Sequence, residues 1–206
     1  VSGVYKTSFF IAVGVNSPIK SVRDLMAAAS VPGKITYASN SIGGPLHLGA
    51  AQIEAATNTK MVHVPYKEIS QLYAAVSTGE VDWALASIAS AGPLLRAGKV
   101  RFIAIADTTR SANMPDVPTF EQAGGPKPVV ANTWVALMAP KGTAAPVTSA
   151  LNRSINDVLR LPDVAEKFSA FGFVPWVTTP ADIAKTIDAD TIANAALVRR
   201  TGASVD

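Results

Sequence analysis

The chain has 206 residues, a length that suits one large α/β domain or two small lobes. Hydrophobic residues make up 49% and charged residues 16%, which excludes an intrinsically disordered chain because such chains combine low hydrophobicity with high charge. No uncharged apolar run reaches the length of about 18 residues that indicates a membrane-spanning helix. The net charge of +3 comes from scattered basic residues, whereas nucleic-acid-binding proteins usually cluster theirs.

The chain contains no cysteine, which excludes disulfides, thiolate metal sites and cysteine nucleophiles. This composition is compatible with an oxidising compartment. The chain begins at Val1 without a signal-peptide pattern, so we expect that a leader has been removed or that the chain is a fragment.

Short apolar and β-branched runs that predict strands alternate with segments of helical periodicity. The predicted strands are residues 9–15, 35–38, 61–64, 81–85, 100–106, 134–138 and 173–177. The predicted helices are residues 21–29, 44–57, 69–79, 147–158, 163–171 and a last helix from 179 toward 199. This alternation predicts βαβ units in a largely parallel sheet. Such sheets bind ligands beyond the carboxyl ends of their strands.

Three strand-to-helix turns therefore become candidate sites. The first, residues 37–48, places small polar side chains before Gly43 and Gly44, which allow the backbone to approach a ligand closely. The helix that follows offers unpaired N–H groups, which suit an anion. An ordinary capped turn explains the same residues equally well. The turns at residues 64–68 and 85–92 are the other two candidates, and a surface turn remains open for the former.

Enzyme motifs are largely absent from the sequence. It has no G-x-S-x-G element and no G-x-G-x-x-G after a strand. The two histidines, His47 and His63, lie on different predicted elements and lack the spacing of metal ligands. A Ser39–His47 pair is conceivable, but no third residue orients it, so a hydrolase is a minor alternative.

Six segments in chain order resemble sequence elements of the substrate-binding proteins of tripartite tricarboxylate transporters, the Bug-type extracytoplasmic solute receptors. The segments are residues 35–48, 61–67 (MVHVPYK), 79–82 (GEVD), 95–101 (LRAGKVR), 114–119 (MPDVPT) and 134–143 (WVALMAPKGT). The resemblance runs along nearly the whole chain, except that the family's first region has no counterpart here. We therefore expect an N-terminally truncated chain.

The resemblance implies an α/β fold of the periplasmic binding protein type II class, a two-lobed flytrap with lobe one incomplete in this chain. Lobe two would span residues 14–131, and residues 1–13 and 132–206 would form the remainder of lobe one and the crossing strands. It implies a periplasmic protein without enzymatic activity, cofactor or metal. Its partners would be a small mono- or dicarboxylate and the membrane permease subunits of the transporter, without nucleic acid and without direct insertion into the membrane.

Carried onto this chain, the resemblance implies a set of ligand-binding residues from the candidate turns and the lobe crossing. They are Ser39, Asn40, Gly43, Gly44, His47, Tyr66, Ser87, Ala89, Ser90 and Trp134. Glu68 departs from the family, which has glycine there, and it would repel a carboxylate unless its side chain points outward. A flytrap-like effector domain of a transcriptional regulator is the other alternative, and the sequence leaves the identity of the carboxylate open.

Overall fold

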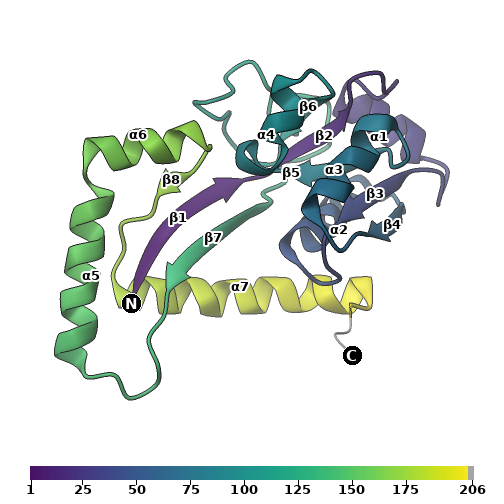
Figure 1. Ribbon diagram of the computed structural model, residues 1–206. Helices are drawn as coiled ribbons and strands as arrows, with labels where there is room; N and C mark the ends of the chain where they lie inside the picture. The colour runs from purple at the N-terminus through teal and green to yellow at the C-terminus, as the bar shows by residue number, and fades with distance from the viewer. Residues whose placement is uncertain (204–206) are drawn as a thin grey trace. The chain divides into compact units, whose positions relative to one another are not determined.

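The computed structural model describes residues 1–203, which divide into two compact units (Figure 1). Of the described residues, the larger unit comprises Ser8–Asn132 and residues 197–203, and the smaller unit comprises Val1–Thr7 and Thr133–Ala196. None of the helices described is long and apolar enough to cross a membrane. The lobe boundaries that the family resemblance implies, at residues 14 and 131, stay a prediction.

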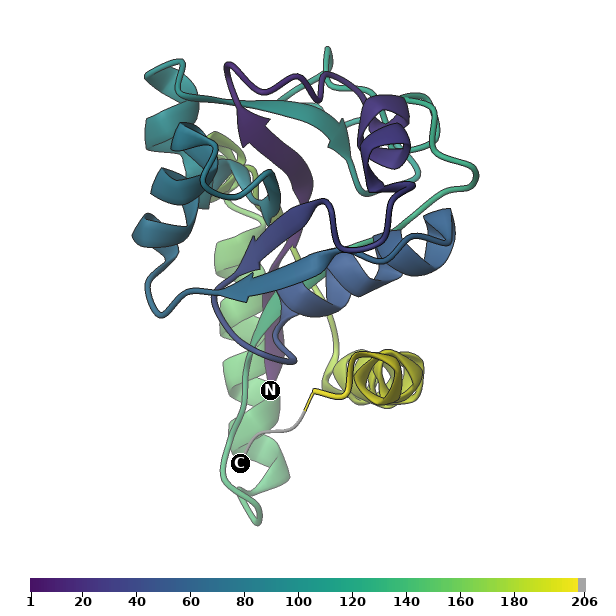
Figure 2. The same ribbon diagram turned by 90° about the vertical axis from the view of Figure 1, so that its right-hand side faces the viewer.

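The larger unit is built on a five-stranded sheet of order β4-β3-β5-β2-β6. Helix α2 covers one face of this sheet, and α3 and α4 cover the other (Figure 2). The strands are β2 (Phe10–Gly14), β3 (Thr36–Ser39), β4 (Val62–Pro65), β5 (Trp83–Ala86) and β6 (Val100–Ile105). The helices are α1 (Val22–Ala29), α2 (Pro45–Thr57), α3 (Ile69–Thr78) and α4 (Ile88–Arg96).

The directions of the strands differ from the sequence prediction. Strand β3 runs parallel to both β4 and β5, but β2 runs antiparallel to both β5 and β6. The prediction of a largely parallel sheet is therefore wrong around β2. Every residue of β2 is buried, and a strand that is covered on both faces shows the same continuous apolar run whichever way it points.

Local signals explain where the helices begin and end. Helix α1 starts after Ser21, whose hydroxyl accepts the N–H of Asp24 at 3.2 Å. Helix α3 stops at Gly79, which adopts a left-handed conformation with φ of +79°. Helix α2 starts at Gly44 and Pro45 without a side-chain cap, so its first N–H groups are not satisfied by a capping side chain.

The core of the larger unit centres on Trp83, which is fully buried. Helix α2 packs closely onto the sheet through Gly49, where an added Cβ atom would lie 2.5 Å from the Leu85 side chain. The carboxylate of Asp82 accepts both the backbone N–H and the hydroxyl of Thr36 at 2.8 Å. This contact ties the start of β3 to the turn before β5, and it holds the parallel strands in register.

The smaller unit contains a three-stranded sheet of order β7-β1-β8. Its elements are β1 (Ser2–Ser8), β7 (Asn132–Leu137), β8 (Val174–Pro175), α5 (Ala145–Leu159), α6 (Pro162–Ala170) and α7 (Pro180–Thr201), whose end reaches into the larger unit. The apolar pattern did not predict strand β1, although the family resemblance implied crossing strands within residues 1–13. Its Tyr5 ring stacks on Phe173 with ring centroids 4.1 Å apart and meets the edge of Phe168 on α6.

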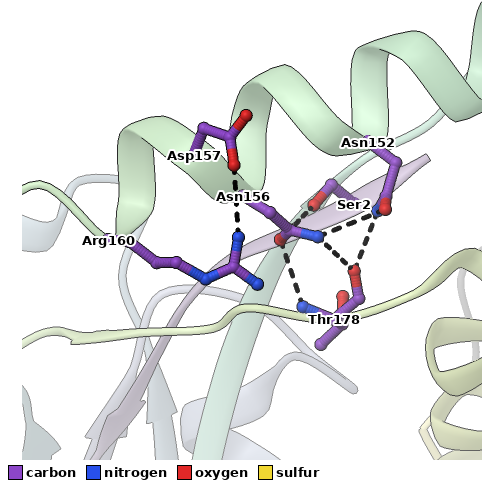
Figure 3. Close-up of polar contacts among 6 residues, drawn as sticks. All are labelled: Ser2, Asn152, Asn156, Asp157, Arg160 and Thr178. Atoms are coloured by element: carbon purple, nitrogen blue, oxygen red, sulfur yellow. Dashed lines mark hydrogen bonds and ion pairs between the residues drawn. The ribbon is translucent and has the colours of Figure 1, made fainter.

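A buried amide holds the smaller unit together (Figure 3). The Asn156 side chain accepts hydrogen bonds from the Ser2 hydroxyl and the Thr178 N–H, and it donates to the Thr178 carbonyl at 2.9 Å. Asn152, one turn earlier on α5, donates to the same carbonyl at 2.8 Å. The network joins the start of the chain, α5 and the segment before α7.

Candidate ligand-binding site

Three parallel strands of the larger unit end at the same edge of the sheet. The registers align Ser39 with Pro65 and Ala38 with Ala84. The turns after β3, β4 and β5 therefore share one edge, as the sequence analysis expected for the carboxyl ends of parallel strands. In the part of the chain described, no group of three or more histidine or acidic side chains could hold a metal ion.

Ser39 is buried and bonds within its own turn. Its hydroxyl donates to the carbonyl of Ser41 at 3.0 Å and lies 2.7 Å from Nε2 of His63. Because the single hydroxyl hydrogen points to Ser41, His63 donates its Nε2 proton to the Ser39 oxygen. His63 therefore has no lone pair toward Ser39 and does not act as its general base. The Ser39–His47 pair, which the sequence left as a minor alternative, does not form, because Ser39 bonds to His63 instead.

His47 supports the loop that precedes α2. Its Nδ1 atom accepts the backbone N–H of Gly43 at 2.9 Å, which assigns the ring proton to Nε2. Gly43 has φ of +74°, a conformation that glycine adopts without strain. The amide of Gly43 is therefore occupied by the protein itself, which the sequence analysis did not anticipate.

The two histidine rings stack on each other, with centroids 4.0 Å apart and planes at 13°. The ring of Tyr37 lies 5.1 Å from that of His63. Burial lowers the pKa of His47. Burial and the neighbouring His47 lower the pKa of His63 to about 4. Both rings are therefore neutral at pH 7, and they orient the loop without contributing a positive charge.

The turn after β5 is capped by side chains of the helix that follows it. Ser87 and Ser90 form a reciprocal capping box at the start of α4, with each side chain bonded to the other residue's backbone N–H. The Ser90 hydroxyl also lies 2.9 Å from that of Tyr73. Ala89, between them in sequence, is half-buried and carries no polar side-chain group. The hydroxyls of Ser87 and Ser90 are therefore already hydrogen-bonded to backbone N–H groups at the start of α4.

The remaining predicted residues are dispersed. Asn40 is exposed beside the buried Ser39. Tyr66 follows β4, and its hydroxyl donates to Glu80 at 3.1 Å. Glu68 is exposed at the start of α3. Trp134 lies in the smaller unit on β7, and its ring N–H donates to Asp190 at 2.7 Å.

Sequence reasoning missed the parts played by His63 and Tyr37. These residues are direct partners in the parallel register of β3 and β4. Tyr37 and Ser39 are two residues apart on β3, so they face the same side of the sheet as His63. The two-residue spacing of Tyr37 and Ser39 was present in the sequence. It predicts contact with His63 only once β3 and β4 are known to be neighbouring strands.

A family model described as the tripartite tricarboxylate transporter family receptor matches residues 1–203 of the chain. The chain belongs to this family. The predictions of a periplasmic binding protein fold and of membership in the tripartite tricarboxylate transporter receptor family are thereby confirmed. Family membership also favours a transport receptor over the regulatory domain and the hydrolase considered from the sequence.

Two curated relatives that the chain matches are longer than the chain. It is 34% identical over 175 residues to the protein BugT of Bordetella pertussis. It is 31% identical over 182 residues to a protein from the tcbD-tcbE intergenic region of Pseudomonas sp. strain P51. The alignments cover 84% and 88% of this chain but 53% and 54% of the relatives. The chain thus spans about half the length of the curated relatives it matches.

Several solved structures have the same fold as this chain. A structure titled a periplasmic transporter is 31% identical with a TM-score of 0.81, over 99% of this chain and 68% of that one. MatC of Rhodopseudomonas palustris, solved with bound malate, is 25% identical with a TM-score of 0.76, over 98% and 67% of the two chains. An R. palustris protein solved with adipate has a TM-score of 0.89 at 24% identity, over 98% and 68%, which shows the fold alone.

Proposed function

We propose that the protein captures a small mono- or dicarboxylate in the periplasm and passes it to the permease subunits of a tripartite tricarboxylate-type transporter. Membership of the receptor family supports this function. The malate complex of MatC, which is 25% identical, supports a carboxylate as the ligand class. The net charge of +3 is compatible with an anionic ligand.

The start of α2 is the observation that carries the proposal. The first hydrogen bond of this helix runs from the N–H of Leu48 to the carbonyl of Gly44 at 2.9 Å. The N–H groups of Leu46 and His47 precede it, and no side chain caps them. Such groups, at the positive end of the helix dipole, bind carboxylates. Each hydrogen bond to the charged group contributes about 1.5–3 kcal/mol.

The residues around the start of α2 have different roles in this proposal. Asn40 is exposed at the sheet edge and supplies a side-chain amide to the carboxylate. Gly43 and His47 hold the loop in shape through their mutual hydrogen bond. Ser87 and Ser90 bring a second helix start to the same edge, but their hydroxyls already cap α4. Helix α2 is therefore the principal anchor.

A pair of charge substitutions tests the proposal. Asn40→Asp places a negative charge at the proposed carboxylate site with little change in shape. Asn113→Asp adds the same charge at an exposed position far along the chain and controls for net charge. With malate as the ligand and intrinsic fluorescence as the readout, we expect Asn40→Asp to weaken binding by about tenfold or more, a change of about 1.4 kcal/mol. Equal weakening by both substitutions would reject the start of α2 as the site.

A further inference from the structure

A cavity of about 510 Å³ lies within the larger unit, beside α2, β3 and β4. Its polar lining comes from Tyr37, His47, Glu54, Thr59, Lys60, His63, Arg200 and Thr201. Ile42, Ala51 and Met61 add apolar surface. The cavity is large enough for a ligand of several non-hydrogen atoms.

One face of α2 forms a wall of the cavity. His47, Ala51 and Glu54 recur at spacings of four and three residues, so they lie on one face of the helix. Leu46 and Ile53 are buried in the core instead. The cavity follows α2 toward the end of the helix, whereas the proposed carboxylate site lies at its start. His47 is the residue that both sites share.

Two nearly buried polar groups line the cavity without a partner. Tyr37 is only 3% exposed, and its hydroxyl has no hydrogen-bond partner among residues 1–203. His47 is 5% exposed, and its Nε2–H likewise finds no acceptor in the described part of the chain. Neither donor atom is sealed from solvent, because Trp83 Nε1 is the one fully buried side-chain atom without a partner in the described part of the chain. Both donors therefore border the cavity with a hydrogen that an acceptor on a ligand can take.

The charges of the lining favour an anion. Lys60 and Arg200 contribute two positive charges, and both side chains are exposed. Glu54 contributes one negative charge, and one of its oxygens already accepts the Met61 N–H at 2.6 Å. Neither cation forms an ion pair with Glu54 within the described residues. With neutral histidines the lining sums to one positive charge, and burial raises the pKa of Glu54.

We propose that this cavity is a second binding site, separate from the start of α2, for a small molecule with one carboxylate and a short apolar body. The Tyr37 hydroxyl and the His47 Nε2–H donate to the carboxylate, and Arg200 and Lys60 attract it to the opening. The apolar part lies against Ala51 and Met61.

The two histidines of the sequence both line the cavity, so no signal from a histidine elsewhere in the chain overlaps their imidazole NMR signals. The probes are propanoate and propylammonium, which have similar size and opposite charge. At pH 7.5 we expect propanoate to shift the His47 Nε2 signal in a saturable way and propylammonium to leave it unchanged. A saturable shift with propylammonium alone, or no saturable shift with either probe, would overturn the proposal.

Three variants locate the binding. Tyr37→Phe removes only the hydroxyl and should weaken propanoate binding by about tenfold. Arg200→Gln should also weaken binding, whereas the adjacent Arg199→Gln, which does not line the cavity, should not. Because Arg200 is exposed, its substitution tests the site even if Tyr37→Phe disturbs the fold. Unchanged affinity in both Tyr37→Phe and Arg200→Gln would refute this site.

Asn40→Asp separates this site from the proposed transport site. It should leave the propanoate response of the cavity unchanged while it weakens malate capture at the start of α2. A cavity response that disappears in Asn40→Asp would show that the histidines merely sense the other site, and the second site would be abandoned. Loss of malate capture alone leaves the cavity proposal standing.

Discussion

The imidazole of His47 accepts the backbone N–H of Gly43 through Nδ1 at a distance of 2.9 Å. This bond links the first turn of α2 to the glycine loop that precedes it. The His47 side chain thereby holds the backbone at Gly43 in place. The conformation of that backbone sets the position of the first N–H groups of α2.

Replacing His47 by leucine should loosen the loop, whereas asparagine should preserve it. The Oδ1 atom of asparagine lies where Nδ1 of histidine lies and also accepts a hydrogen bond. Leucine offers no acceptor, so we expect the amide hydrogen of Gly43 to exchange about tenfold faster in His47→Leu. Hydrogen exchange followed by NMR measures this rate. Equal exchange in both variants would show that the contact does not hold the loop.

Stability should fall on acidification through the stacked histidines. The pKa of His63 is about 4 in the folded chain, against an ordinary value of 6.5. Between these values the unfolded state binds the additional proton, so the free energy of unfolding increases with pH and levels off above about pH 6.5. The contribution of His63 to the free energy of unfolding is therefore lost as the pH falls from 6.5 toward 4. Urea unfolding at pH 7.5, 6 and 5 measures it.

His63→Gln is the matched variant for this titration. Glutamine retains a donor for Ser39 but does not titrate. We expect its free energy of unfolding to change less between pH 6.5 and 4 than that of the unsubstituted chain. The comparison cancels the contributions of groups common to both proteins. The same pH dependence in both would assign the acid sensitivity to other residues.

The amide of Asn156 should contribute far more to stability than its charged neighbour. Asn156 is 7% exposed and bonds to Ser2 and Thr178, so Asn156→Ala leaves buried backbone groups without partners. We expect a loss of about 1–3 kcal/mol in the free energy of unfolding. Asp157→Ala breaks an exposed ion pair with Arg160 and should cost less than about 0.5 kcal/mol (Figure 3). Chemical unfolding of the two variants compares these costs, and equal losses would contradict the network's role.

Arg101 should hold the loop between β2 and α1. Its guanidinium donates to the carbonyls of Ser17 and Ile19 at 2.7 and 2.9 Å, and to that of Val15. Lysine carries the same charge but cannot reproduce this planar array of donors. We expect Arg101→Lys to increase proteolytic cleavage in residues 15–20 several-fold, and Arg153→Lys, an exposed position on α5, to leave it unchanged. No difference between them would assign the loop's order to other contacts.

Much of the element pattern was predictable from the sequence because local signals agreed with the fold. The runs at residues 35–38 and 61–64 become β3 and β4, and Gly79 ends α3 as its position suggested. The strand β1 escaped detection because Gly3 and Lys6 interrupt its apolar pattern. Its pairing with β8 depends on residues more than 150 positions away, and no local pattern contains that information.

The candidate site was predictable in its location but not in its contacts. Alternating strands and helices placed Ser39 and Ser87 at one edge of the sheet. The partners of those side chains depend on distant segments, as the bond between Ser39 and His63 shows. The occupied amide of Gly43 depends on a rotamer of His47, which the sequence does not specify.

Calorimetric titration of the protein with malate and with its uncharged diamide tests most directly whether this receptor captures carboxylates. The two compounds share a carbon skeleton, so a difference between them isolates the contribution of the carboxylates. We expect a saturable heat with malate and none with the diamide, because the proposed function has the unpaired N–H groups at the start of α2 bind the carboxylate. Equal binding of both compounds, or no heat with malate and other mono- and dicarboxylates, would contradict carboxylate capture.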